Sequence, residues 1–175
     1  LEYLLSINTR LICVIRNPLD VCISMYFFYE MRKEQCEQRN IFDYVKQNIK
    51  RISEKTIDFY QRSVSNNKCL IVKFEDLITN IDNSLVKIYN FINKYNRLPT
   101  PKYELIKQKI NFKVVQQEEK KNGIYKVGRI QKSLFHRSGK IGQSKEHFSK
   151  KKINQLLALT PKEIFKLYPS NLYIS

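Results

Sequence analysis

The chain has 175 residues, with 32 Lys and Arg against 16 Asp and Glu and a formal net charge of +16. This length is enough for one domain with its own hydrophobic core, so neither disulfides nor a structural metal are needed for stability. The charge predicts either affinity for anionic ligands or an ordinary solvated lysine-rich surface. A helix that spans a bilayer needs roughly 20 apolar residues, and no apolar run in this chain approaches that length, which excludes a membrane segment in it.

Two short apolar segments, "RLICVIR" at 10–16 and "KCLIVKF" at 68–74, are typical of strands covered on both faces of a parallel sheet. The residues between these two segments have the spacing of helices, with apolar side chains mostly three or four positions apart. These are Val21, Met25, Phe28, Tyr29, Phe42, Val45, Ile49, Ile52, Ile57 and Tyr60. A strand, helices and a second strand in this order indicate a parallel crossover.

Three further amphipathic stretches predict helices over 83–95, 103–119 and 149–168, the last with Ser149 as its N-cap. Between the last two, residues 120–149 are basic and show little periodicity, so we expect a long loop. All four glycines of the chain fall after position 120. A glycine-rich phosphate loop is therefore excluded from the first 120 residues.

Arg16 stands at the carboxyl end of the first predicted strand. Asn17 and Pro18, followed by Asp20, predict a helix start immediately after it. Strand ends of this kind line ligand crevices in α/β proteins, and a helix start favours an anion. With Ser24 one turn later, this arrangement predicts a phosphate site. The plainer alternative is that Arg16 pairs with a nearby carboxylate, at Asp20 or Asp76.

Three segments follow one another along the chain: "VIRNPLDVCISMYFF", "CLIVKFEDL" and "FHRSGKIGQSKEHFS". Together they resemble the sulfotransferases that use 3′-phosphoadenosine 5′-phosphosulfate (PAPS). In that order they are similar to the family's RNPxDxxxS segment, its strand ending in YEDL and its RKGxxGDWKxxFT signature. The weaker "INFKVV" is similar to the family's TSFxxM element. The resemblance implies an α/β fold: a three-layer sandwich with a mainly parallel sheet, related to the P-loop nucleotide hydrolases.

The resemblance implies that Arg16 and Ser24 hold the 3′-phosphate of PAPS. Arg137, Ser138 and Gly139 would close on the same phosphate from the late basic loop. The residues of that loop also indicate an anion site without the resemblance, because Arg137 supplies charge and glycines let backbone amides approach an anion closely. An ordinary basic loop is the alternative.

The adenine contacts implied by the resemblance are Phe74, where the family usually has a tyrosine, and Phe112. The late motif departs from the family in three places: Ser138 replaces a lysine, and Gln143 and Ser144 replace the DW pair. One cation is therefore missing, which implies weaker nucleotide affinity or a divergent subfamily.

The family's general base is a histidine, and a lysine near its N-terminus assists departure of the leaving group. We expect both upstream of Leu1, so residues 1–175 would form a single, incomplete C-terminal part of the domain, inactive by itself and without catalytic residues. His136 and His147 are expected to be structural or surface residues. The only cofactor implied is PAPS, with no metal.

The implied reaction moves a sulfonate group from PAPS to a hydroxyl or amine on a small-molecule or glycan acceptor. Two alternatives stay open: a basic protein that binds nucleic acid or another polyanion, which no recognised aromatic motif supports, and a nucleotide kinase of related fold. Four cysteines without CxxC spacing favour free thiols and hence a cytoplasmic location, or a Golgi membrane if an anchor precedes Leu1. A homodimer is left open.

Overall fold

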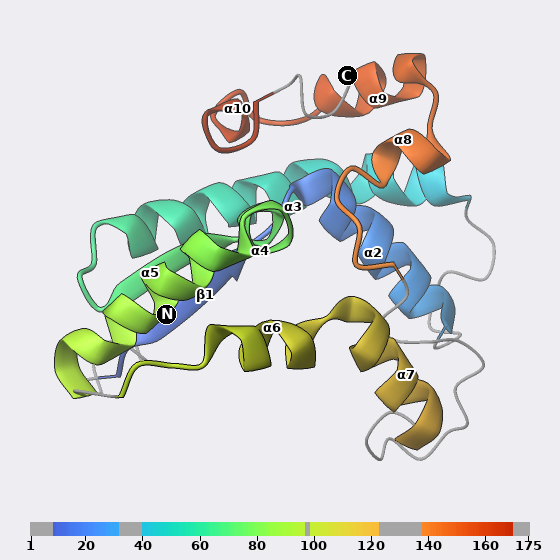
Figure 1. Cartoon of the computed structure of the whole chain (residues 1–175). Coiled ribbons are helices and arrows are strands. Elements are labelled where there is room, and N and C mark those ends of the chain that lie inside the picture. The colour runs from blue at the N-terminus through green and yellow to red at the C-terminus, as the bar shows by residue number, and fades with distance from the viewer. Residues whose placement is uncertain (1–8, 32–39, 97–98, 123–137, 170–175) are drawn as a thin grey trace.

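The computed structural model describes residues 9–31, 40–96, 99–122 and 138–169 (Figure 1). Its elements follow in chain order: β1 Leu11–Ile15, α2 Pro18–Met31, α3 Ile41–Val64, β2 Cys69–Lys73, α4 Phe74–Thr79, α5 Ile81–Asn96, α6 Tyr103–Ile110, α7 Phe112–Asn122, α8 Ser144–His147, α9 Lys150–Leu157 and α10 Ile164–Leu167.

β1 and β2 pair in parallel, with Leu11 opposite Cys69 and Ile15 opposite Lys73. The helices α2 and α3 connect them, so the predicted parallel crossover is confirmed. Because the strands run in the same direction, their carboxyl ends lie at one edge of the sheet. Arg16 follows one strand there and Phe74 follows the other.

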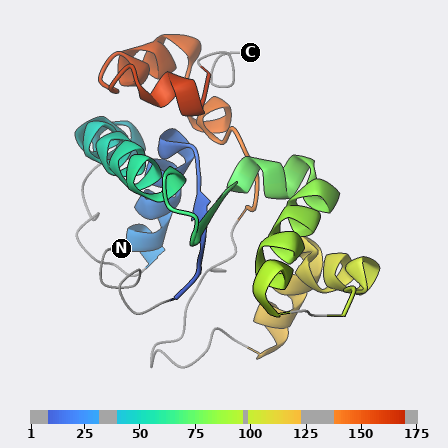
Figure 2. The same ribbon diagram turned by 90° about the vertical axis from the view of Figure 1, so that its left-hand side faces the viewer.

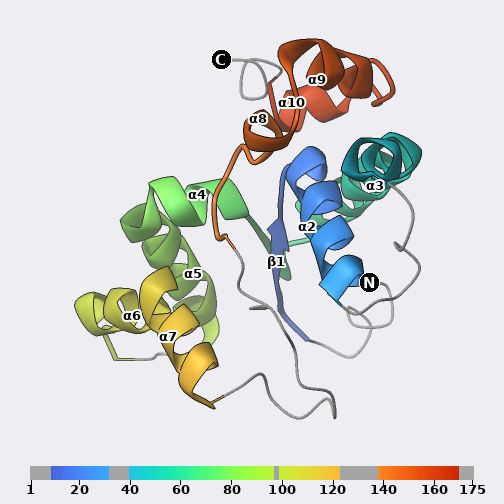
Figure 3. The same ribbon diagram turned by 90° about the vertical axis from the view of Figure 1, so that its right-hand side faces the viewer.

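The strands lie between two groups of helices, with α2 and α3 on one side and α4 and α5 on the other (Figures 2 and 3). Ile15 belongs to the main core on the side of α2 and α3. On the opposite face Val72 of β2 is buried, whereas Ile12 and Val14 of β1 are 40% and 54% exposed. The prediction that the first strand is covered on both faces is therefore wrong for the part of the chain described, because α4 and α5 cover that face over β2 only.

The main core is formed largely by helices and is contributed by α2, α3 and the last three helices. Its most buried side chains are Leu19, Cys22, Ile23, Val45, Ile49, Leu156, Ile164 and Tyr168. The helices α8 to α10 lie over α3 (Figure 1), and this packing carries the segment from Ser138 to Gln143 past the start of α2. We refer to residues 138–143 as the late loop.

Side-chain caps explain where several helices begin. The Oδ1 atom of Asn17 accepts the amide hydrogen of Leu19 at 2.9 Å, and Ser149 accepts that of Lys152 at 3.4 Å. Both predicted N-terminal caps are confirmed, and each satisfies an amide that has no partner within its own helix.

Two predicted helices are shorter than expected. The stretch 149–168 divides into α9 and α10, because Pro161 cannot donate the backbone hydrogen bond of a continuous helix. The stretch 103–119 divides at Asn111, whose side chain accepts the amide hydrogen of Lys113 at 3.0 Å and starts α7. Since α7 continues to Asn122 and α8 begins at Ser144, the predicted loop over 120–149 is also too long.

Candidate functional site

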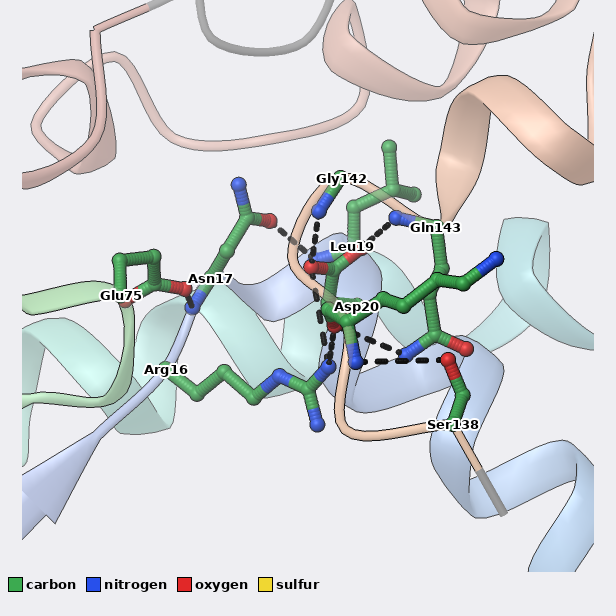
Figure 4. A network of polar contacts seen from close by, with 9 residues as sticks. Arg16, Asn17, Leu19, Asp20, Glu75, Ser138, Gly142 and Gln143 are labelled. Carbon is green, nitrogen blue, oxygen red and sulfur yellow. Dashed lines mark hydrogen bonds and ion pairs between the residues drawn. The ribbon is translucent and has the colours of Figure 1, made fainter. Parts of the chain in front are cut away.

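Arg16 links the sheet to the late loop. It leaves β1 at the carboxyl end of the sheet, and its Nη2 atom donates to the carbonyl oxygen of Lys140 at 2.7 Å (Figure 4). Its Cζ atom lies 4.3 Å from the centroid of the Phe74 ring. Phe74 is the first residue of α4 and directly follows β2. A guanidinium is attracted to the face of an aromatic ring, so the Phe74 ring and the loop carbonyl together fix its position.

Asp20, whose charge is opposite to that of Arg16, also contacts the late loop. Its Oδ2 atom accepts the amide hydrogen of Gly142 at 2.7 Å and its Oδ1 atom that of Gln143 at 2.8 Å (Figure 4). Arg16 lies 3.8 Å away, so the ion pair that was the plainer alternative is present in the structure. Burial raises the pKa of the Asp20 carboxyl, against the opposing effect of these amides and of Arg16.

The late loop turns at two glycines, Gly139 and Gly142, whose φ angles of 61° and 70° lie in the left-handed region. A β-carbon added to Gly139 would lie 2.5 Å from ring atoms of Phe112, so only glycine lets the loop press against this ring. The Oγ atom of Ser138 accepts the amide hydrogen of Lys140 at 3.3 Å. The loop thus touches the first residue of α7 as well as the start of α2.

Lys140 does not take the place of the family's lysine, which is serine at position 138 of this chain. Its Nζ atom pairs with Glu146 at 2.6 Å, and both side chains are largely exposed. In the part of the chain that the structure describes, Arg16 is a cation that donates directly to the backbone of this loop.

Glu75 is a part of the site that sequence reasoning missed. Its Oε1 atom accepts the amide hydrogen of Asn17 at 2.9 Å, which ties the start of α4 to the residue that caps α2. Burial raises the pKa of Glu75, and the negative charge of Asp20 adds to that rise. The only sequence signal that could have pointed to Glu75 as part of the site is its position just after a predicted strand.

The structure brings five of the predicted nucleotide contacts into one connected group: Arg16, Phe74, Phe112, Ser138 and Gly139. Ser24 lies four residues after Asp20 on α2, and its side chain is exposed. Arg137 lies outside the described residues, as does His136. Whether these side chains contact a nucleotide stays a prediction.

His147 is half-buried and packs against aromatic side chains. Its ring lies 5.3 Å from that of Phe27 on α2 and 6.4 Å from that of Phe148. In the described ranges, no three or more His, Cys, Asp or Glu side chains cluster so as to hold a metal ion. None of the helices described there combines the length and apolar character that crossing a membrane requires.

The sequence profile of the sulfotransferase domain matches residues 1–166. The chain therefore belongs to the sulfotransferase family, as the three motifs predicted. No curated protein sequence matches it significantly.

Several solved structures are similar to the chain, and two of them illustrate the likeness. One is retinol dehydratase in complex with androsterone and the inactive cofactor PAP, at 18% identity, a TM-score of 0.66 and 86% coverage of this chain. The other is mouse sulfotransferase SULT7A1 complexed with PAP, at 16% identity, a TM-score of 0.68 and 98% coverage. This chain spans 46% of the first of those chains and 63% of the second. The likeness confirms the predicted α/β fold.

Proposed function

We propose that this chain supplies the 3′-phosphate and adenine contacts of an enzyme that transfers a sulfonate group from PAPS to a hydroxyl or amine acceptor. The proposal rests mainly on the junction between Arg16 and the late loop, because there a permanent cation and a loop that turns at two glycines meet at the start of a helix. The acceptor would belong to a small molecule or a glycan.

The donor set of the site fits a phosphate. The Nε atom of Arg16 is buried and has no hydrogen-bond partner among the described residues, although a buried charged donor without a partner is costly. A phosphate oxygen would satisfy it. The nearby carboxylate of Asp20 lies 3.8 Å from the Nη2 atom of Arg16, and this ion pair leaves Nε without a hydrogen bond.

The aromatic rings of the site fit a purine. Phe74 lies under the Arg16 guanidinium, and Phe112 lies against Gly139, so each ring is in contact with a group proposed to bind the phosphate. A base that packs on the Phe74 ring would therefore lie close to Arg16. Phenylalanine at position 74 offers a face for stacking but no hydroxyl for a polar contact.

When bound, PAPS supplies the sulfonate and PAP is the leaving group. The residues of this chain would act by holding and orienting the nucleotide, since fixing one reactant accounts for much of the rate in group transfer. Arg16 would neutralise the 3′-phosphate, and the late loop would close over it.

Calorimetric titration of the intact protein with adenosine 3′,5′-bisphosphate tests this proposal. Arg16→Gln should weaken binding by about 10- to 100-fold, the range expected for losing hydrogen bonds to a charged group. Arg62→Gln is the matched control, because Arg62 is exposed on α3 and pairs there with Asp58. It should leave the affinity unchanged.

The same two variants separate the alternative functions. A protein that binds RNA or heparin through its general basic surface would bind them equally well after Arg16→Gln and would not bind the bisphosphate selectively. A nucleotide kinase would transfer phosphate from ATP and would show no preference for a 3′-phosphate. Either result would contradict the proposed function.

A further inference from the structure

Two side chains of opposite charge hold the late loop against α2. Arg16 donates to the Lys140 carbonyl oxygen, and Asp20 accepts the amide hydrogens of Gly142 and Gln143. We propose that Asp20 is a positioning residue that fixes the late loop over the nucleotide's 3′-phosphate. This inference rests on the proposed function and names the residue that organises its binding site.

Asp20 is unsuited to contact the phosphate itself. Its side chain is almost fully buried, and a carboxylate beside a phosphate would repel it. Burying a carboxylate also costs free energy unless hydrogen bonds compensate for it. The two hydrogen bonds from the loop amides offset this cost, so the placement of the loop accounts for a buried carboxylate at this point.

The geometry of the loop shows how this placement works. The positive φ of Gly142 belongs to the turn in which two successive amides, those of Gly142 and Gln143, point toward the same carboxylate. Without Asp20 these amides would lose their partner. Because unsatisfied buried amides are costly, the loop would move to reach water. Ser138 and Gly139 lie only a few residues away and would move with it.

The matched variants are Asp20→Asn and Asp43→Asn. Both residues are the third of a helix, Asp20 in α2 and Asp43 in α3, so each change removes a favourable interaction with a helix start. Only Asp20 reaches the late loop. Asn keeps one acceptor oxygen but places an NH₂ group against the second loop amide, so it cannot hold both.

Hydrogen exchange of the loop amides in the intact protein measures the positioning directly. In Asp20→Asn, exchange at Gly142 and Gln143 should be about tenfold faster or more, and adenosine 3′,5′-bisphosphate should bind about tenfold more weakly. Asp43→Asn should change neither quantity.

A second pair of variants tests the same contact without altering Asp20. Gln143→Pro removes the amide that donates to Oδ1, and the Gln143 φ of −58° suits proline. Gln143→Ala loses the same side chain but keeps the amide. The proline variant should bind the bisphosphate about tenfold more weakly than the alanine variant. This pair applies even if Asp20→Asn does not fold.

The outcomes of the two proposals are distinguishable. Unchanged loop exchange in Asp20→Asn, or equal affinities of the proline and alanine variants, would overturn the positioning role. A loosened loop with unchanged bisphosphate affinity would also overturn it. If the wild-type protein does not bind the bisphosphate at all, the proposed function fails, and loop exchange still shows whether Asp20 holds the loop.

Discussion

The guanidinium of Arg16 lies 4.3 Å from the centre of the Phe74 ring, across the carboxyl ends of two neighbouring strands. The two residues are 58 positions apart in the sequence, yet the parallel pairing of β1 and β2 places them side by side. This contact orients the arginine that the proposed function depends on.

Replacement of Phe74 therefore affects the arginine as well as the base. Phe74→Leu should weaken binding of adenosine 3′,5′-bisphosphate by about two- to fivefold or more, because a partly exposed cation–π contact contributes about 0.5–1 kcal/mol. Phe74→Tyr keeps the ring and should retain full affinity. Calorimetry on both variants checks this, and equal losses in Leu and Tyr would contradict it.

The two glycines of the late loop should respond differently to alanine. Both have positive φ, which costs an alanine about 1–2 kcal/mol. A β-carbon at Gly142 meets nothing within 4 Å, whereas at Gly139 it would lie 2.5 Å from the Phe112 ring. Urea unfolding should therefore show a larger loss of stability for Gly139→Ala than for Gly142→Ala.

The clash itself can be tested by removing the ring. In the background of Gly139→Ala, the further change Phe112→Ala should cost less stability than Phe112→Ala costs in the wild-type protein. Additive losses would mean that the loop does not press on Phe112.

Glu75 should make the stability of the protein depend on pH. Burial raises its pKa above the ordinary value of 4.5, so the folded protein binds the proton more tightly than the unfolded chain does. Its contribution to the free energy of unfolding is therefore greatest in acid and is lost as the pH rises from about 4.5 through the raised pKa.

Urea unfolding of Glu75→Gln and of the wild type, compared across this pH range, measures that contribution. The advantage of the wild type over the variant should shrink as the pH rises. Glu54→Gln, the same change at an exposed position of α3, controls for the chemistry of the substitution and should show a much smaller trend. An advantage that grows with pH would contradict the raised pKa.

Cys22 should be chemically inert in the folded protein. It is fully buried in the core, and burial raises its pKa to about 12, so almost no thiolate forms at neutral pH. Cys69 is only partly buried. Alkylation followed by peptide mapping should label Cys69 before Cys22, and Cys22 should react only when urea unfolds the protein. Rapid native labelling of Cys22 would show that the α2 core opens readily.

Local sequence signals predicted the parts of the fold that depend on neighbouring residues. The start of α2 at Pro18 follows from Asn17, and the cap of α9 follows from Ser149, because each cap acts within three residues. The parallel pairing of the two strands follows from their apolar character and the helices between them. The break before α10 was also visible in principle, since Pro161 marks it.

Long-range contacts could not be predicted in the same way. Asp20 reads as a helix-start acid, and nothing in its surroundings shows that its partners are amides more than 120 positions away. The exposure of Ile12 and Val14 likewise depends on which helices cover β1. The resemblance to the sulfotransferases implied that the late loop lies near Arg16, but the contacts that hold the loop there were seen only in the structure.

The central claim is that Arg16 recognises a 3′-phosphate, and a thermodynamic cycle tests it most directly. Calorimetry would compare adenosine 3′,5′-bisphosphate with adenosine 5′-monophosphate on the wild-type protein and on Arg16→Gln. We predict that the wild type prefers the bisphosphate by about 10- to 100-fold and that Arg16→Gln loses most of this preference while its affinity for the monophosphate hardly changes. Equal weakening of both ligands, or no preference in the wild type, would contradict the account.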